Sequence, residues 1–413
     1  MKKLQFKRHL KKDSILNLCL RGLTILCKFL LSILIVKKLS VNDLGVFGIF
    51  QTTITLVIYI LGFDFYTYNA RELIKNERGS INYYIGNQAV FHLLVYLIVL
   101  PLSFFLFLKN IINIEYVLYF YIILVFEHIS QEIYRMLIAI KKSVIASLTL
   151  FLRSGLWVLM LFMFWELIYG KAEISLVFSL WIVGVIISII VGVVFLKFKP
   201  RFKVDLYWIG KGIKMSLPFL IATIFYKIIE FSGRYFLDFY WTKEEVGIFT
   251  FYSGISNAMF VFVQSMVIVV MSPYLIESSN IGKEEFFKVF KKYKKQIITT
   301  TIIGFLLACI CIYPLLFIIG NELLLKNIDV FLLLLLAVVF FCFSYIPHYG
   351  LYVYHQDKQL LSTSIMGACV VVLLNFSLVP RFGVLGASFA QVISMFTLFI
   401  SKWFIYRKFK NEN

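Results

Sequence analysis

The stretch ISLVFSLWIVGVIISIIVGVVFL, at residues 174–196, contains no charged side chain and would be apolar on every face of a helix. A helix needs about 20 mostly apolar residues to cross the hydrocarbon core of a membrane. A strand of a membrane barrel would instead alternate apolar and polar residues over about ten positions. This stretch therefore predicts a transmembrane helix.

The whole chain of 413 residues has a membrane composition. Hydrophobic residues make up 61% of it and charged residues 15%, and the mean hydropathy is +0.89. Soluble domains are about half apolar and about a quarter charged. The composition therefore excludes a soluble enzyme, a secreted disulfide scaffold and a nucleic-acid-binding protein, although the formal net charge is +19. The six cysteines all lie in apolar stretches, and we interpret them as small apolar fillers.

Twelve apolar blocks are long enough to span a membrane. A basic, polar tail at residues 1–13 precedes the first block, whose length favours a span over a cleavable signal peptide. We therefore predict an all-α polytopic membrane protein with twelve transmembrane helices. The predicted spans are residues 14–36, 44–63, 85–108, 116–138, 144–164, 174–196, 216–237, 246–271, 297–319, 328–350, 360–379 and 384–406.

The distribution of Lys and Arg predicts the orientation. An even number of spans places both termini on one side of the membrane, and the tails and loops of that side carry 27 of the 41 basic residues. The opposite loops carry 7, and the remaining 7 lie within spans. Because cytoplasmic loops of membrane proteins are enriched in Lys and Arg, we expect both termini in the cytoplasm.

The chain divides in the sequence at its most basic internal segment. Residues 197–215 are predicted to form a cytoplasmic linker between an N-terminal six-helix lobe, 1–196, and a C-terminal six-helix lobe, 216–413. The segment SVNDLGVF (40–47) aligns without gaps with TKEEVGIF (242–249), and each lies between the first and second helix of its lobe. Six spans per lobe give the lobes the same orientation, so we predict a pseudo-two-fold axis along the membrane normal, with a substrate path between the lobes.

Ionisable side chains within the spans are the strongest functional signal. A charge at the bilayer centre costs roughly 2.5–3.5 kcal/mol on an insertion scale. Five such cations would cost roughly 15 kcal/mol in lipid, whereas the total stability of a fold is about 5–15 kcal/mol. These cations must therefore face water or a partner. They are Arg21, Lys28, Arg153, Lys227 and Arg234.

We interpret these cations as a cavity that binds a phosphate or pyrophosphate group. Arginine offers phosphate two parallel hydrogen bonds and lysine a point charge. The acidic and imidazole groups within the spans are predicted to serve ion coupling or charge pairing; they are Glu127, His128, Glu132 and Glu230.

Simpler interpretations stay open. Glu230 can neutralise Lys227 or Arg234, Glu132 can form a local ion pair with Arg135, and His128 can be a buried neutral imidazole. Arg153, about ten residues from either end of its span, can also be purely structural.

Several chemistries have no support in the sequence. There is no GxxxxGK[ST] loop, no HExxH or GxSxG motif and no clustered Cys/His pattern. We therefore predict no catalytic residue, no metal site, no cofactor and no enzymatic activity. The longest outside loops have about ten residues, which argues against a membrane-bound polysaccharide polymerase or ligase.

Three segments carry a family resemblance: KKLSVNDLGVFGIFQTTITLVIYILGFDFYTYNARELI (37–74), GRYFLDFYWTKEEVGIFTFYSGISN (233–257) and LLNFSLVPRFGVLGASFAQVIS (373–394). With them, the chain resembles the Wzx-type flippases of bacterial polysaccharide synthesis, in the superfamily that includes the MATE exporters and the lipid II flippases. The resemblance implies twelve helices in two lobes around a central cavity. Similar proteins begin the second segment with Asp, where this chain has Gly233.

The resemblance also implies an activity. Wzx-type proteins move an undecaprenyl-pyrophosphate-linked oligosaccharide across the bacterial cytoplasmic membrane by alternating access, for O-antigen or capsule synthesis. The implied partners are this lipid-linked substrate, membrane lipids, a polysaccharide polymerase and a chain-length regulator, with no nucleic acid. Alternatives are an ion-coupled small-molecule exporter of the MATE type, a membrane polysaccharide polymerase or ligase, and an assembly scaffold.

Overall fold

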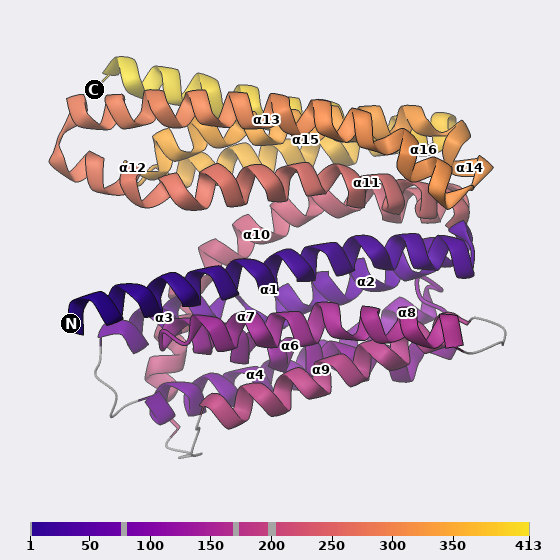
Figure 1. Ribbon diagram of the computed structural model, residues 1–413, viewed down its shortest axis with the longest axis horizontal. Coiled ribbons are helices and arrows are strands. Elements are labelled where there is room, and N and C mark those ends of the chain that lie inside the picture. Colours follow the sequence, from indigo (N-terminus) through magenta and orange to yellow (C-terminus); the bar gives the residue numbers. More distant parts are fainter. Residues whose placement is uncertain (1, 76–80, 168–172, 197–203, 413) are drawn as a thin grey trace. The chain divides into compact units, whose positions relative to one another are not determined.

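The computed structural model describes residues 2–75, 81–167, 173–196 and 204–412, and these residues are helical throughout, apart from short turns (Figure 1). Ten of the described helices are long and apolar enough to cross a membrane. The chain is therefore a multi-pass, all-α membrane protein.

The described chain forms two compact units. The first contains residues 1–39 and 49–223, and the second contains residues 40–48 and 224–413. Helix α10 (Leu206–Tyr240) belongs to both units, because the boundary between them falls within it. The first residues of α2 (Val41–Gly62) belong to the second unit.

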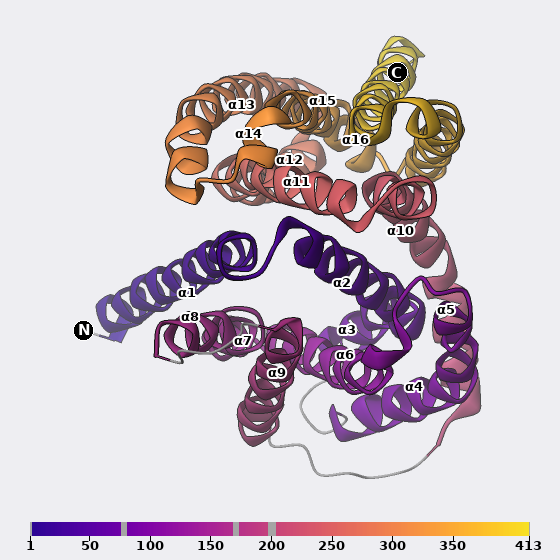
Figure 2. The same ribbon diagram turned by 90° about the vertical axis from the view of Figure 1, so that its right-hand side faces the viewer.

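In the first unit, α6 is the central helix. It contacts α3, α7 and α9, and the end-on view of Figure 2 shows it surrounded by them. Besides α2 and the first part of α10, the described helices of this unit are α1 (Lys2–Lys38), α3 (Phe65–Lys75), α4 (Ile81–Ser103), α5 (Phe105–Leu108), η2 (Ile114–Tyr116), α6 (Val117–Ala139), α7 (Ser143–Phe151), the π-helical η3 (Leu152–Leu156), α8 (Trp157–Leu167) and α9 (Ile174–Leu196).

In the second unit, the long helices pack side by side, and α15 contacts α11, α13 and α16. The turn between α12 and α13 lies at the same end as the C-terminus, and α14 lies at the opposite end (Figure 1). The helices that follow α10 are α11 (Lys243–Val263), the π-helical η4 (Gln264–Ile268), α12 (Val269–Ile281), α13 (Lys283–Ile319), α14 (Glu322–Lys326), α15 (Ile328–Tyr352) and α16 (Asp357–Glu412).

The two similar octapeptides begin helices, as their sequences predict. The Ser40 hydroxyl accepts a hydrogen bond from the Asp43 amide at 3.0 Å. Thr242 is the N-cap of α11, and its side chain accepts from the Glu245 amide at 3.3 Å. In both cases the cap satisfies an amide that the first helical turn leaves free, and the first turn carries acidic side chains.

The same octapeptides also contact each other within the second unit. A Cβ atom on Gly45 would lie 1.8 Å from the carbonyl oxygen of Lys243. A Cβ atom on Gly247 would lie 1.9 Å from the carbonyl oxygen of Val41. The starts of α2 and α11 therefore touch backbone to backbone, at two positions where only glycine fits.

Helix α16 contains a sharp break at Gly383, where φ is 53° and ψ is −132°. A Cβ atom on Gly386 would lie 2.4 Å from the carbonyl oxygen of Leu378, so the chain folds back closely on itself at this point. The Glu245 carboxylate accepts a hydrogen bond from the Val384 amide at 2.7 Å and so caps the second half of the helix.

Two segments that the sequence places in cytoplasmic loops are helical. Residues 206–215, expected in the linker, are the first turns of α10, and residues 272–296 continue α12 and α13 with a break at Gly282. Phe286, Phe290 and Tyr293 are buried at a spacing that puts them on one face of α13. The basic residues between them cover the other faces, so the segment is an amphipathic extension of a span.

Candidate functional site

A pocket in the second unit combines charged, aromatic and amide side chains. Its walls come from α10, α11, α15 and α16. Arg234 and Glu230 are its charged lining residues, and the other polar and aromatic ones are Tyr226, Phe249, Ser253, Ser256, Asn257, Phe341 and Gln391. The pocket can therefore offer an anion contact, stacking surfaces and hydrogen bonds to one ligand.

Hydroxyl groups hold the Arg234 guanidinium. Its Nε donates to Thr250 Oγ1 at 3.2 Å, and its Nη2 donates to Ser253 Oγ at 2.8 Å. The guanidinium carbon lies 5.6 Å from the ring centroid of Phe231 and 5.8 Å from that of Phe249. Among the described residues no carboxylate forms an ion pair with Arg234, so its charge is positioned by neutral groups.

Lys227 takes the nearby carboxylate instead. Its Nζ lies 2.7 Å from Glu230 Oε2, and the ammonium also lies 5.4 Å and 5.0 Å from the rings of Tyr226 and Phe231. Of the two cations that Glu230 was expected to neutralise, it pairs with Lys227. The pair lies three residues apart on α10, which is a contact distance along a helix face.

In the first unit, Arg153 and Glu127 form a buried ion pair. Arg153 Nε lies 3.1 Å from Glu127 Oε1, and the two residues are each 7% exposed. Glu127 Oε2 also accepts from the Trp181 indole at 3.2 Å. Arg153 lies in the π-helical turn η3, and its carbonyl accepts from the Trp157 indole at 3.0 Å. This pairing provides Arg153 with a counterion, as a structural role requires, and its assignment to substrate handling stays a prediction.

Arg21 and Lys28 are exposed on α1. Arg21 Nε donates to Ser147 Oγ of α7 at 3.3 Å, and Lys28 lies within electrostatic range of Arg153 and Glu127. The first unit thus places three of the five predicted cations on two contacting helices, α1 and η3. Lys227 and Arg234 both lie on α10 in the second unit.

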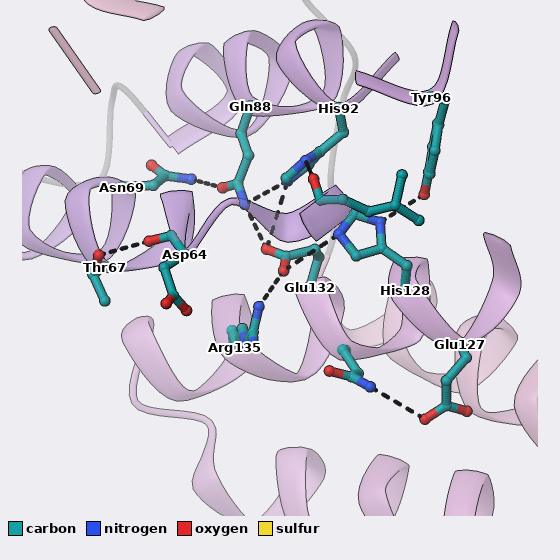
Figure 3. A network of polar contacts seen from close by, with 12 residues as sticks. Asp64, Thr67, Asn69, Gln88, His92, Tyr96, Glu127, His128, Glu132 and Arg135 are labelled. Carbon is teal, nitrogen blue, oxygen red and sulfur yellow. Dashed lines mark hydrogen bonds and ion pairs between the residues drawn. The ribbon is translucent and has the colours of Figure 1, made fainter. Parts of the chain in front are cut away.

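The predicted residues His128 and Glu132 belong to a buried polar cluster in the first unit (Figure 3). Glu132 Oε1 lies 2.5 Å from Arg135 Nη1, so the local ion pair considered from the sequence is present. Glu132 Oε2 accepts from Gln88 Nε2 at 2.5 Å, and His128 Nδ1 lies 2.6 Å from the Tyr96 hydroxyl.

Asp64 lies beside this cluster in the turn between α2 and α3 (Figure 3). Its Oδ2 accepts from Thr223 at 2.8 Å. Burial raises the pKa of its carboxyl group, and the hydrogen bond from Thr223 partly opposes this shift.

The sequence interpretation missed His92, Gln88 and Tyr96, all on α4. Gln88 and His92 are four residues apart, as are His128 and Glu132 on α6. Residues at this spacing share a helix face. Two spans that each carry a polar pair four residues apart are therefore a signal for a polar contact between helices, although it does not say which spans pack together.

Comparisons with solved structures show the fold. A multidrug resistance MATE family transporter of the MOP superfamily, in an inward-facing conformation, matches with a TM-score of 0.77 and 15% identity, over 95% of this chain and 97% of that chain. The lipid II flippase MurJ, in an inward closed conformation, matches with a TM-score of 0.74 and 15% identity, over 96% of this chain and 87% of that chain. The chain therefore has a fold like that of MATE and MurJ.

The sequence comparison shows the family. No curated protein matches the chain. The model of the family described as polysaccharide biosynthesis protein matches residues 10–279, about two thirds of the chain. The residues of the Arg153–Glu127 pair, the polar cluster on α4 and α6, and the Arg234 side of the pocket all lie within this match. The chain belongs to the polysaccharide biosynthesis protein family.

Proposed function

We propose that this protein is a flippase that moves undecaprenyl-pyrophosphate-linked oligosaccharide repeat units across the bacterial cytoplasmic membrane. It would supply the synthesis of a surface polysaccharide such as O-antigen or capsule. Membership of the polysaccharide biosynthesis family and a fold like that of a lipid II flippase support this proposal.

The observation that carries the proposal is the position of Arg234. Its guanidinium lines a pocket and is held by two hydroxyl groups and two aromatic rings. A guanidinium with no paired carboxylate can form charge-assisted, two-pronged hydrogen bonds to a phosphate. Glu230 does not cancel this charge directly, because it pairs with Lys227.

The other walls of the pocket suit a sugar. Tyr226 and Phe341 offer ring faces, and Asn257 and Gln391 offer amide donors and acceptors. Sugars present apolar C–H faces to rings and hydroxyl groups to polar side chains, so the same pocket can bind the sugar next to the pyrophosphate.

The transport cycle that we propose follows the predicted architecture. Counting α6 and dividing α16 at Gly383 would raise the ten candidate spans to the twelve that we propose, in two six-helix lobes. The lobes would be related by a pseudo-two-fold axis and alternate access to a cavity, with both termini in the cytoplasm. Arg21 and Lys28 would attract the pyrophosphate from the first unit, and the protein would act as a transporter without enzymatic activity.

The test is flipping of a purified lipid-linked oligosaccharide in proteoliposomes. Arg234→Ala should lower the flipping rate by about 10- to 100-fold, the value of a charge-assisted hydrogen bond. Arg234→Lys should keep part of the rate, because it keeps the charge and loses the two-pronged geometry. Lys288→Ala is the matched control, because it also removes one cation of the second unit. Among the described residues, the ion-pair partners of Lys288 are the exposed Glu284 and Glu285.

The same variants separate the proposal from its alternatives. In cells, loss of a flippase leaves lipid-linked repeat units on the inner leaflet, whereas loss of a polymerase lets single units reach the surface. A drug-resistance phenotype with normal surface polysaccharide would identify an exporter instead. A normal flipping rate for Arg234→Ala would show that the pocket does not bind the substrate.

A further inference from the structure

Two imidazoles and a carboxylate converge inside the first unit (Figure 3). His92 Nε2 lies 3.8 Å from Glu132 Oε2, and His128 Nε2 lies 3.9 Å from Glu132 Oε1. One donor atom from each of the three residues lies within 4.8 Å of the others. All three side chains are buried, with exposed fractions of 8%, 1% and 7% for His92, His128 and Glu132.

The Nδ1 atoms of His92 and His128 each have a hydrogen-bond partner. His92 Nδ1 lies 3.2 Å from the carbonyl oxygen of Leu61 on α2, which can only accept, so this nitrogen carries the proton. His128 Nδ1 lies 2.6 Å from the Tyr96 hydroxyl. Metal-binding histidines are oriented in this way, by a hydrogen bond at the ring nitrogen that does not bind the metal. The lone pair of His92 Nε2 therefore points inward.

His128 Nε2 has no hydrogen-bond partner among the described residues, although it is fully buried. A buried nitrogen without a partner costs free energy unless something binds it. Gly62, the last residue of α2, has no side chain on this side: a Cβ atom there would lie 3.4 Å from His128 Nε2, 3.6 Å from Arg135 Nη1 and 3.7 Å from Glu132 Oε1. The nitrogen and the carboxylate oxygen therefore face the same position beside Gly62, which the Arg135 guanidinium also borders.

We propose that His92, His128 and Glu132 bind a zinc ion that joins α4 to α6. Zinc takes imidazole nitrogen and carboxylate oxygen at about 2.0–2.2 Å, commonly with two His and one Glu as the protein ligands. Imidazole nitrogens disfavour Na⁺, Mg²⁺ and Ca²⁺, which bind oxygen. The sequence predicts no metal site because the usual metal-binding motifs place their ligands close together in one helix or loop. These ligands lie on two helices, α4 and α6.

Gln88 supplies a fourth donor. Its Nε2 now contacts both His92 Nε2, at 3.1 Å, and Glu132 Oε2. Rotating the Gln88 amide by half a turn would direct its oxygen toward the ion. Asn69 already bonds to Gln88, and its Oδ1 is buried with no partner in the described chain. A matching rotation of Asn69 would let that oxygen accept from Gln88, so the two amides can exchange their roles together.

Arg135 would compete with the zinc ion for the Glu132 carboxylate. Its guanidinium lies 2.5 Å from Glu132 Oε1 and stacks over the Tyr66 ring, 3.9 Å from the centroid. A cation on the same carboxylate lowers the affinity for a second cation. The site should therefore bind zinc more tightly when Arg135 loses its charge, a result that a purely structural role for the cluster does not predict.

The experiment measures metal binding by the full-length protein, purified in detergent with a tag free of histidine, stripped with EDTA and then equilibrated with Zn²⁺ or Co²⁺ and freed of unbound metal. We expect one Zn²⁺ per chain by elemental analysis, and one Co²⁺ whose visible absorption reports a nitrogen and oxygen ligand set. His92→Ala and His128→Ala should weaken binding by about 100-fold or more, since each removes a direct ligand. His348→Ala and His355→Ala are the matched controls and should bind as the parent does.

Two further variants keep the ligands in place. Arg135→Gln should bind Zn²⁺ more tightly than the parent, and Gly62→Val should bind it more weakly by filling the space beside His128. Zn²⁺ should raise the thermal unfolding midpoint of the parent and not that of His128→Ala. Absence of stoichiometric binding by the folded parent protein would overturn the proposal, as would binding that survives both ligand substitutions or is unchanged in Arg135→Gln.

Discussion

Single residues show how this chain keeps charges inside a membrane. The buried Arg153 has Glu127 as its counterion, and Glu127 also accepts from Trp181. Arg234 is held by hydroxyl groups and rings instead. The cost of a buried charge was sufficient to predict that these side chains need partners. The choice of partner depends on which helices pack together, and that choice is not encoded in local spacing.

The Arg153–Glu127 pair leads to a stability prediction. Arg153→Ala should lower the free energy of unfolding by about 3–5 kcal/mol, because it leaves the Glu127 carboxylate buried without a counterion. The measurement is the thermal unfolding midpoint in detergent. The double variant Arg153→Met with Glu127→Leu should recover most of the loss, because it removes both charges and keeps the volume.

This double-variant comparison also separates the two roles of Arg153. If the double variant is stable and still flips the substrate, Arg153 serves the fold alone. If it is stable and inactive, the prediction that Arg153 handles substrate gains support. An Arg153→Ala variant as stable as the parent would contradict the structural role of the pair.

Helices are the scale at which the sequence was most informative. The N-caps at Ser40 and Thr242 were predictable, because a hydroxyl three residues before an acidic side chain is a helix-start signal. The extensions of α10 and α13 were not predictable in this way, because a basic stretch between two apolar blocks predicts a loop. Here the basic residues form the polar face of an amphipathic helix. The break of α16 at Gly383 matches the gap between two predicted spans.

The contact between the starts of α2 and α11 leads to a second stability prediction. Gly45→Ala should destabilise the second unit by about 3 kcal/mol or more, since a Cβ atom 1.8 Å from the Lys243 carbonyl must push the two backbones apart. The measurement is again the thermal midpoint.

Gly210→Ala is the control for this substitution. Gly210 lies in α10, and a Cβ atom there would have no neighbour within 4 Å. Alanine favours a helix by about 1 kcal/mol over glycine, so this variant should be at least as stable as the parent. Equal midpoints for Gly45→Ala and Gly210→Ala would contradict the close contact.

The whole molecule shows the limits of reading a membrane protein from composition. Membrane insertion and an all-helical class followed from hydropathy alone. Span number is harder, because α6 carries two glutamates and an arginine and so differs from an ordinary span, although it is the central helix of its unit. The residues that make α6 atypical in composition, Glu127, Glu132 and Arg135, are those that its neighbours bind.

The predicted orientation can be tested on intact cells. In a cysteine-free background, a single cysteine at Arg381, beside the break in α16, should react with a membrane-impermeant maleimide added outside. A single cysteine at Lys288, in the basic extension of α13, should react only after the membrane is opened. The positive-inside bias is the physical reason for both expectations. The reverse pattern of labelling would place the termini outside.

The backbone contact between Gly45 and Gly247 also constrains how the two octapeptides can evolve. Each glycine lies against the main chain of the other octapeptide. A side chain at either glycine would therefore clash with a backbone carbonyl of the other octapeptide, whatever side chains that octapeptide carries. No compensating replacement on the opposite helix can relieve a clash with a main-chain carbonyl. The two glycines should therefore persist in relatives long after the surrounding letters of both motifs have diverged.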